Sequence, residues 1–149
     1  MMKKTLAAAV ALGAFVVTAP ASAVPGYATG RLEVRAGPDH DYPTVGFARP
    51  GSRIEINGCL RDWSWCDVTT RSDRGWVRGR EIQAEYRGRR VAYGSPWHTP
   101  VVSFTFGSYW DNHYRNRPFY RERVRWERHY HDRDRDHHRR GPDRHDRGR

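Results

Sequence analysis

Apolar and polar residues alternate along several short stretches in the first half of the chain. Leu32 and Val34 alternate with charged residues, and Ile54 and Ile56 repeat the pattern farther on. A period of two places one set of side chains on a buried face and the other in solvent, so it predicts short β-strands. The apolar positions that would form the core are Leu32, Val34, Val45, Ile54, Ile56, Val68, Val77 and Ile82.

Turn-forming residues separate these predicted strands. Gly37-Pro38 ends the first strand, because glycine adopts backbone angles that other residues avoid and proline lacks an N–H donor. The charged residues 39–41 then form a surface loop, and Pro50-Gly51 supplies the next turn. Polar turns at residues 60–64 and 71–75 complete the series. The pattern predicts an all-β domain.

Four motifs follow one another in this part of the chain. They are Leu32-x-Val34-Arg35-x-Gly37-Pro38, Tyr42-Pro43-x-Val45-Gly46, Pro50-Gly51 and Gly75-Trp76-Val77. Together they resemble the bacterial SH3-type (SH3b) domain over about residues 28–83, although Glu33 and Ala36 stand where that family usually has Asn and Ser. The resemblance implies a small SH3-like barrel of about five strands, which we assign to residues 24–83, and a tight helical turn at residues 79–82.

The first residues have the features of an export signal. Lys3 and Lys4 precede an apolar run, and Ala21-Ser22-Ala23 has the small residues of a cleavage site. The apolar run is too short to span a bilayer comfortably. We therefore expect residues 1–23 to be removed and the rest to be exported, to the periplasm or the extracellular space, with no transmembrane segment remaining.

The rest of the chain is strongly basic, and arginine supplies all of its positive side chains other than histidine. The only two lysines lie in the signal, so 25 arginines face 17 acidic residues and leave a net charge of +8. The guanidinium group suits carboxylates, phosphates and aromatic rings. With 30% charged residues and a mean hydropathy of −0.95, the whole chain cannot be one packed core. One small domain with a polar extension fits better.

Cys59 and Cys66 are the only two cysteines. Two cysteines in an exported chain indicate one disulfide, and the intervening turn makes a cross-strand bridge reasonable. The alternative is a metal site, but two cysteines at this spacing with no paired histidines nearby are a poor zinc signature. We predict the Cys59–Cys66 disulfide and neither a metal nor another cofactor.

Residues 84–128 form an extension rich in arginine and aromatic residues. A small hairpin about Arg87-Gly88 is expected at its start. Val102, Phe104 and Phe106 then alternate with smaller or polar residues, which predicts a strand at about 101–106. A soluble exported protein would not leave that apolar face exposed without a use. We expect residues 101–106 and the following aromatic stretch to pack on the barrel, and the alternative is a peptide that orders only on a partner.

The tail, residues 129–149, alternates arginine with aspartate and contains several histidines, but almost no apolar residues. Such composition cannot bury enough surface to fold, so we predict a disordered tail. Its histidines also suggest divalent metal ions, although the neighbouring arginines would repel cations.

Candidate binding residues lie near the predicted loops. Exposed aromatic side chains beside a groove often stack on ligands, and arginines bind carboxylates. The set that could form a shallow binding face is Arg35, Asp39, Tyr42, Trp63, Trp65 and Arg80. An equally good interpretation is that Trp63 and Trp65 shield the disulfide and each other.

No catalytic constellation is visible, because the serines lack a nucleophile context and the carboxylates occur singly in turns or among arginines. The sequence, with the resemblance, therefore favours a non-catalytic binding module of the bacterial cell envelope. Its expected partner is cell-wall (peptidoglycan) peptide or an envelope protein. The alternative is an interaction protein whose extension docks on an envelope protein or an anionic surface. Arginines interleaved with aromatics also suit nucleic acid, but export argues against that as a physiological partner.

Overall fold

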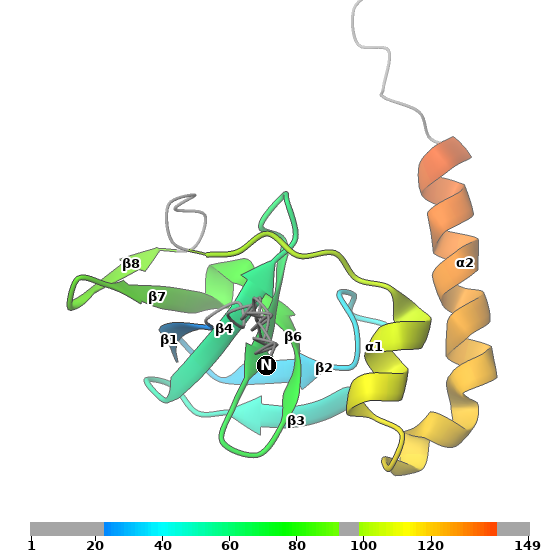
Figure 1. The fold of residues 1–149 in the computed structure, drawn as a ribbon, viewed down its shortest axis with the longest axis horizontal. Helices are drawn as coiled ribbons and strands as arrows, with labels where there is room; N and C mark the ends of the chain where they lie inside the picture. Colours follow the sequence, from blue (N-terminus) through cyan, green and yellow to red (C-terminus); the bar gives the residue numbers. More distant parts are fainter. Residues whose placement is uncertain (1–22, 93–98, 140–149) are drawn as a thin grey trace, which may run out of the picture.

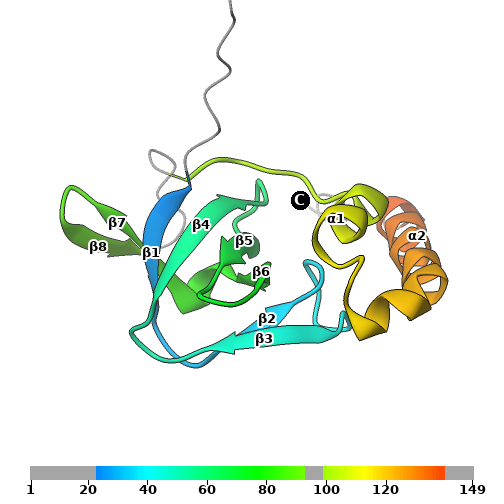
Figure 2. The same ribbon diagram turned by 60° about the horizontal axis from the view of Figure 1, so that its bottom comes forward.

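The structure is a computed structural model that describes residues 23–92 and 99–139 (Figure 1). Residues 1–22 of the predicted export signal and residues 140–149 of the predicted tail lie outside the described residues. Within the described part, a strongly bent sheet lies beside two helices, which pack at one side of it (Figures 1 and 2).

One antiparallel sheet contains the eight strands of the described residues, in the order β3-β2-β6-β5-β4-β1-β7-β8. The strands are β1 (Val24–Ala28), β2 (Leu32–Arg35), β3 (Thr44–Ala48), β4 (Arg53–Cys59), β5 (Trp65–Thr69), β6 (Arg74–Arg78), β7 (Ile82–Tyr86) and β8 (Arg89–Ala92). The predicted all-β, SH3-like architecture is confirmed, with more strands than the expected five or so. The helical turn is confirmed as η1 (Gly79–Glu81), and the hairpin about Arg87-Gly88 as β7 and β8.

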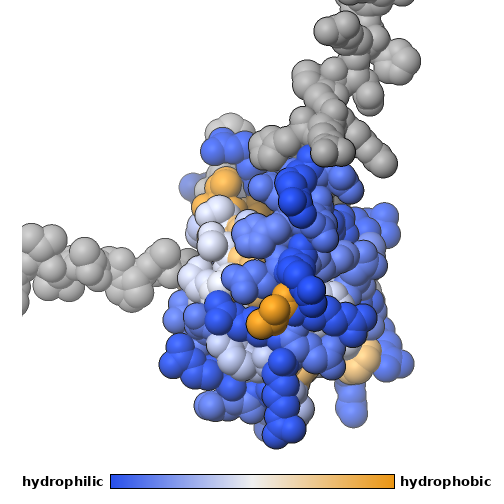
Figure 3. Space-filling view, turned by 90° about the vertical axis from the view of Figure 1, so that its right-hand side faces the viewer, coloured by the Kyte–Doolittle hydropathy of each residue, from blue (hydrophilic) through white to orange (hydrophobic). Residues whose placement is uncertain are grey.

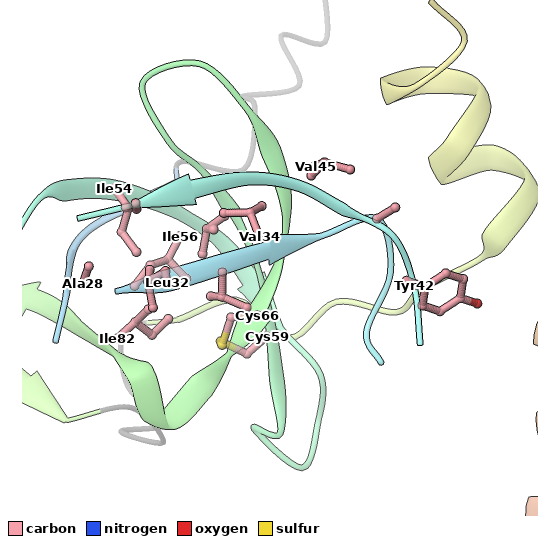
Figure 4. Close-up of a cluster of buried hydrophobic side chains, with 14 of the residues drawn as sticks. Ala28, Leu32, Val34, Tyr42, Val45, Ile54, Ile56, Cys59, Cys66 and Ile82 are labelled. Atoms are coloured by element: carbon pink, nitrogen blue, oxygen red, sulfur yellow. A yellow bond between two sulfur atoms is a disulfide. The ribbon is translucent and has the colours of Figure 1, made fainter. Parts of the chain in front are cut away.

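The core of the sheet is the one that the alternating pattern predicts. Leu32 and Val34 are fully buried, whereas Glu33 between them is exposed. All eight predicted core residues are buried, and Figure 4 shows most of them gathered inside the bend of the sheet. Burial of this apolar surface is the main stabilising contribution to such a domain.

The predicted disulfide joins Cys59 of β4 to Cys66 of β5 within this core (Figure 4). The two residues are direct partners in the antiparallel register, which is why their side chains meet. Both are almost fully buried.

The outward side of β5 and β6 is covered as well. Four of the five residues of β5 are buried, rather than every second one. The ring of Trp76 on β6 packs against Phe104 and Tyr109 of the extension, at centroid distances of 5.5 and 5.7 Å. The extension therefore forms a second layer on this part of the sheet.

Helix α1 (Phe106–His113) holds that layer to the barrel. Trp110 is completely buried and donates its indole N–H to the carbonyl of Ala36, at 2.9 Å. The hydroxyl of Tyr114 donates to the carbonyl of Arg74. The prediction that the extension packs on the domain is confirmed.

The predicted strand at about 101–106 is wrong. Val101 forms only an isolated parallel bridge with Cys59, and α1 begins at Phe106. The signal that competes with the alternation is the spacing of Phe106, Trp110 and Tyr114. Residues four apart lie on one face of a helix, and all three are buried.

The prediction of a disordered tail is wrong for residues 129–139. After η2 (Pro118–Glu122), helix α2 (Arg123–Arg139) runs through them. Trp126 and Tyr130 pack against the core, and Arg133 forms ion pairs with Asp39 and Asp41. Contacts with the barrel therefore supply the stability that the composition of this segment lacks.

We predict that Trp110→Ala destabilises the whole protein by about 3–5 kcal/mol, because it removes a large buried side chain and its hydrogen bond. Urea unfolding gives this difference. Val124→Ala, at a side chain of α2 that is 67% exposed, is the control and should change stability by less than about 0.5 kcal/mol. An unchanged unfolding midpoint for Trp110→Ala would show that the extension does not belong to the cooperative unit.

The disulfide gives a second prediction. Replacing both cysteines by alanine should lower the free energy of unfolding by about 2–3 kcal/mol, because the cross-link restricts a short loop in the unfolded chain. The unfolding midpoints of the oxidised protein and of the variant provide the comparison. Alkylation of the denatured, non-reduced protein should label neither cysteine, and labelling of both would refute the cross-link.

Candidate ligand-binding cavity

A cavity of about 610 Å³ lies between the barrel and its extension. Four segments far apart in the sequence form its walls: the β2–β3 loop, the β4–β5 loop, the chain leading to α1, and α2. The lining residues are Pro38, Asp39, Tyr42, Leu60, Arg61, Val101, Val102, Ser103, Phe104, Tyr130, Arg133 and Asp134. Its size is that of pockets that accept small molecules or a few residues of a peptide.

Three aromatic rings form an apolar part of the wall. Phe104 lies between Tyr42 and Tyr130, with centroid distances of 5.8 Å to each. Tyr42 is 3% exposed, whereas the other two are only partly buried. Burial raises the pKa of the Tyr42 phenol well above its ordinary value, so the ring stays neutral at physiological pH. This wall suits an apolar or aromatic group of a ligand.

Charged side chains lie around the aromatic wall. Arg133 of α2 pairs with Asp39 and with Asp41, the second at 3.4 Å, so these ions fix the distance between the helix and the β2–β3 loop. Arg61, on the opposite loop, is exposed and makes no ion pair with the described residues. Its guanidinium is available to a carboxylate.

The β2–β3 loop is held in place by Arg35. Its guanidinium donates to the carbonyls of His40 and Tyr42, at 2.6 and 2.9 Å, and to the carboxylate of Glu33. Glu33 also accepts a hydrogen bond from Thr44, and these contacts hold its pKa below the ordinary value. Glu33 thus joins Arg35 and Thr44 in a network that supports this loop.

The β4–β5 loop has its own local support. Asp62 accepts hydrogen bonds from both the backbone N–H and the hydroxyl of Ser64, and the hydroxyl bond is the main reason that its pKa is lowered. Trp63 adopts a left-handed backbone conformation, with φ of 59°, and its side chain packs on the core. This local geometry places Leu60 and Arg61 at the cavity.

The six predicted binding residues do not form one surface. Asp39 and Tyr42 line the cavity, and Arg35 positions the loop that carries them. Trp65 is buried rather than outward-facing, under the guanidinium of Arg78 and the ring of His40. Trp63 and Arg80 are not among the lining residues. Thus a single shallow face that includes all six is not what the fold builds.

The sequence interpretation missed the lining residues that come from the second half of the chain, above all Tyr130 and Arg133, together with Leu60 and Arg61. The spacing of Trp126, Tyr130 and Arg133 is a helical signal that would have placed the last two on one face. No sequence signal indicates which loop that face approaches.

The described part of the chain contains no group of three or more His, Cys, Asp or Glu side chains placed to hold a metal ion. Within the same residues, no helix is both long and apolar enough to cross a membrane.

Comparison with known proteins gives one match. The family model of the bacterial SH3 domain matches residues 30–83, which is 54 of the 149 residues. Neither the comparison with curated proteins nor that with solved structures finds a match. The matched region contains β2 to β6 and the start of β7, whereas β8, α1 and α2 lie beyond it. The chain thus contains a bacterial SH3-type domain, and most of the β7–β8 hairpin and the two helices lie outside the matched region.

Proposed function

We propose that this protein is a non-catalytic binding module of the bacterial cell envelope, which holds a peptide in the cavity between its barrel and its extension. Bacterial SH3 domains are generally modules that bind cell-wall material. The observation that carries the proposal is an aromatic wall beside a guanidinium, that of Arg61, which makes no ion pair within the described part of the chain. Phe104 and Tyr130 offer apolar contact, and Arg61 offers a carboxylate partner.

Cell-wall peptide fits this chemistry. Peptidoglycan stem peptides carry carboxylates close to small apolar groups, so one residue of such a peptide could fill the aromatic wall while its carboxylate reaches Arg61. The extended chain at residues 101–104 supplies a third wall, with backbone groups that a peptide can bind. A segment of an envelope protein with the same combination is the other peptide that suits the cavity.

Export is part of the proposal. The signal-like residues 1–23 lead to it, and the buried Cys59–Cys66 disulfide supports it, because such bonds persist in oxidising compartments. The periplasm or the extracellular space would also bring the cavity into contact with cell-wall material.

The alternative, in which the extension docks on an envelope protein through its aromatic residues, is less well supported. Phe106, Trp110 and Tyr114 are all buried against the barrel, so they are not available to another surface. The side of the molecule that carries α2 is mainly hydrophilic, with few apolar residues scattered on it (Figure 3).

The test compares two arginines. Arg61→Gln should weaken binding to purified cell-wall sacculi, and to a soluble stem peptide, by about tenfold, because one charge-assisted hydrogen bond is lost. Co-sedimentation and calorimetric titration measure the two affinities. Arg80→Gln is the matched control: this arginine is also exposed but lies outside the cavity, and we expect wild-type binding.

Two results would contradict the proposal. If Arg80→Gln weakens binding and Arg61→Gln does not, the ligand occupies a face around η1 instead of the cavity. If the wild-type protein binds neither sacculi nor the stem peptide, cell-wall peptide is not the ligand.

A further inference from the structure

The hairpin that joins β7 to β8 has an unusual residue in its turn. Arg87 and Gly88 are the two turn residues, and both have left-handed backbone angles, with φ of 48° and 73°. Turns of this kind favour Asn, Asp or Gly, because a longer side chain at positive φ is sterically disfavoured. The shape of the turn therefore does not explain the arginine, whose guanidinium lies over the ring of the neighbouring Tyr86, 5.1 Å from its centroid. Conformational strain at one position often accompanies a functional role of its side chain.

Arg87 belongs to a group of arginines at this end of the sheet, which we call the arginine hairpin (residues 86–90). Arg87, Arg89 and Arg90 are exposed, and none of the three forms an ion pair with the described residues. Arg90 lies over the ring of Tyr27, 3.9 Å from its centroid, and Arg53 is the register partner of Tyr27. Arg53 and Arg90 thus both lie near Tyr27, at the base of a hairpin whose end carries Arg87 and Arg89.

Fewer carboxylates than arginines lie near this end of the sheet. Glu85 is the register partner of Arg90, but it accepts the hydroxyl hydrogen bond of Tyr27, at 2.7 Å. Glu55 is exposed two residues along β4 from Arg53. At the turn itself no acidic residue is present, because residues 86–91 contain three arginines and no aspartate or glutamate.

The arginine hairpin also projects from the rest of the molecule. It lies on the side of the sheet away from α1 and α2 (Figures 1 and 2), and a Cβ added at Gly88 would meet no atom within 4 Å. None of its residues lines the cavity. The family match ends at residue 83, so this turn and β8 lie outside the matched region.

We propose that the arginine hairpin binds the phosphate groups of an anionic lipid surface. Guanidinium groups bind phosphate oxygens in pairs, and a projecting turn can reach a layer of headgroups without a complementary pocket. The turn presents little apolar surface that a protein interface would bury: Val91, the one aliphatic residue of residues 86–91, is already partly buried against the core. Because the cavity is elsewhere, the two surfaces can be occupied together.

The test uses the oxidised protein without its signal and vesicles of phosphatidylcholine, alone or mixed with phosphatidylglycerol. The mixed vesicles should bind the protein, and the neutral ones should not. The variant Arg87→Asn/Arg89→Gln/Arg90→Gln should bind the mixed vesicles roughly 100-fold more weakly, since each arginine near an anionic membrane contributes about fivefold. Asparagine suits the turn, so the variant should keep the wild-type thermal midpoint.

A matched control removes the same charge elsewhere. Arg121, Arg125 and Arg128 are exposed on η2 and α2, and their replacement by glutamine should leave vesicle binding nearly unchanged. Equal weakening by both triple variants would overturn the proposal in favour of net charge alone, and so would wild-type binding by the hairpin variant. If soluble polyphosphate binds as tightly as the vesicles and competes with them, the phosphate source is a polyanion and the lipid assignment is wrong.

Vesicle binding by the hairpin can be tested separately from ligand binding in the cavity. The hairpin variant should still bind sacculi if the cavity holds cell-wall peptide, and Arg61→Gln should still bind the mixed vesicles. If the hairpin variant loses vesicle binding but keeps sacculus binding, the loss is due to the hairpin and not to the cavity.

Discussion

The buried carboxylate of Asp67 is bound by side chains from both halves of this protein, the barrel and the extension. It is 4% exposed, and a charge at that depth destabilises a fold by several kcal/mol unless it is paired and hydrogen-bonded. Arg74, on the neighbouring strand, donates to it through two nitrogens, and Tyr109 donates its hydroxyl from α1. Burial raises the pKa of Tyr109 far above its ordinary value, so the phenol stays a hydrogen-bond donor. A barrel without the extension would leave this carboxylate with one partner fewer.

The same packing determines where a ligand can bind. The outward side of β5 and β6, with Trp65 and Trp76, is occupied by residues of the chain itself. The open space lies farther along, where the chain leading to α1 and helix α2 meet the two loops at that end of the barrel. Arg133 maintains that arrangement through Asp39 and Asp41. The cavity therefore forms only where the extension packs on the barrel, and the matched domain contributes only part of its wall.

Sequence patterns predicted the barrel well, because its strands are half-buried and their alternation is regular. Leu32 and Val34 show this, and so does the pairing of Cys59 with Cys66. The same rule failed for residues 101–106, where Phe104 lies in an irregular connecting segment and Phe106 begins helix α1. It also failed for the tail. Residues 129–139 are helical because they contact distant parts of the chain, and amino-acid composition does not reveal such contacts.

The candidate site shows the same division. Asp39 and Tyr42 could be proposed from the sequence, because they lie in a predicted loop. The charge of Arg35 suggests a binding residue, yet its guanidinium donates to backbone carbonyls of that loop. Strand parity suggests a binding residue at Trp65 as well, but it fails because the outward face of β5 is itself covered. In a two-layer protein, exposure cannot be inferred from the alternation of one strand, since the second layer comes from a distant part of the chain.

The two proposed surfaces differ in the way that each depends on the fold. The cavity forms only when four separate segments are in place, and two of them belong to the extension. Its affinity for a ligand is therefore coupled to the stability of the extension. The arginine hairpin requires only the pairing of β7 with β8, and its side chains project into solvent. Loosening helices α1 and α2 would therefore weaken the binding of a ligand in the cavity before it affects the hairpin. A protein held at an anionic surface by its hairpin could keep that attachment while the cavity exchanges its ligand.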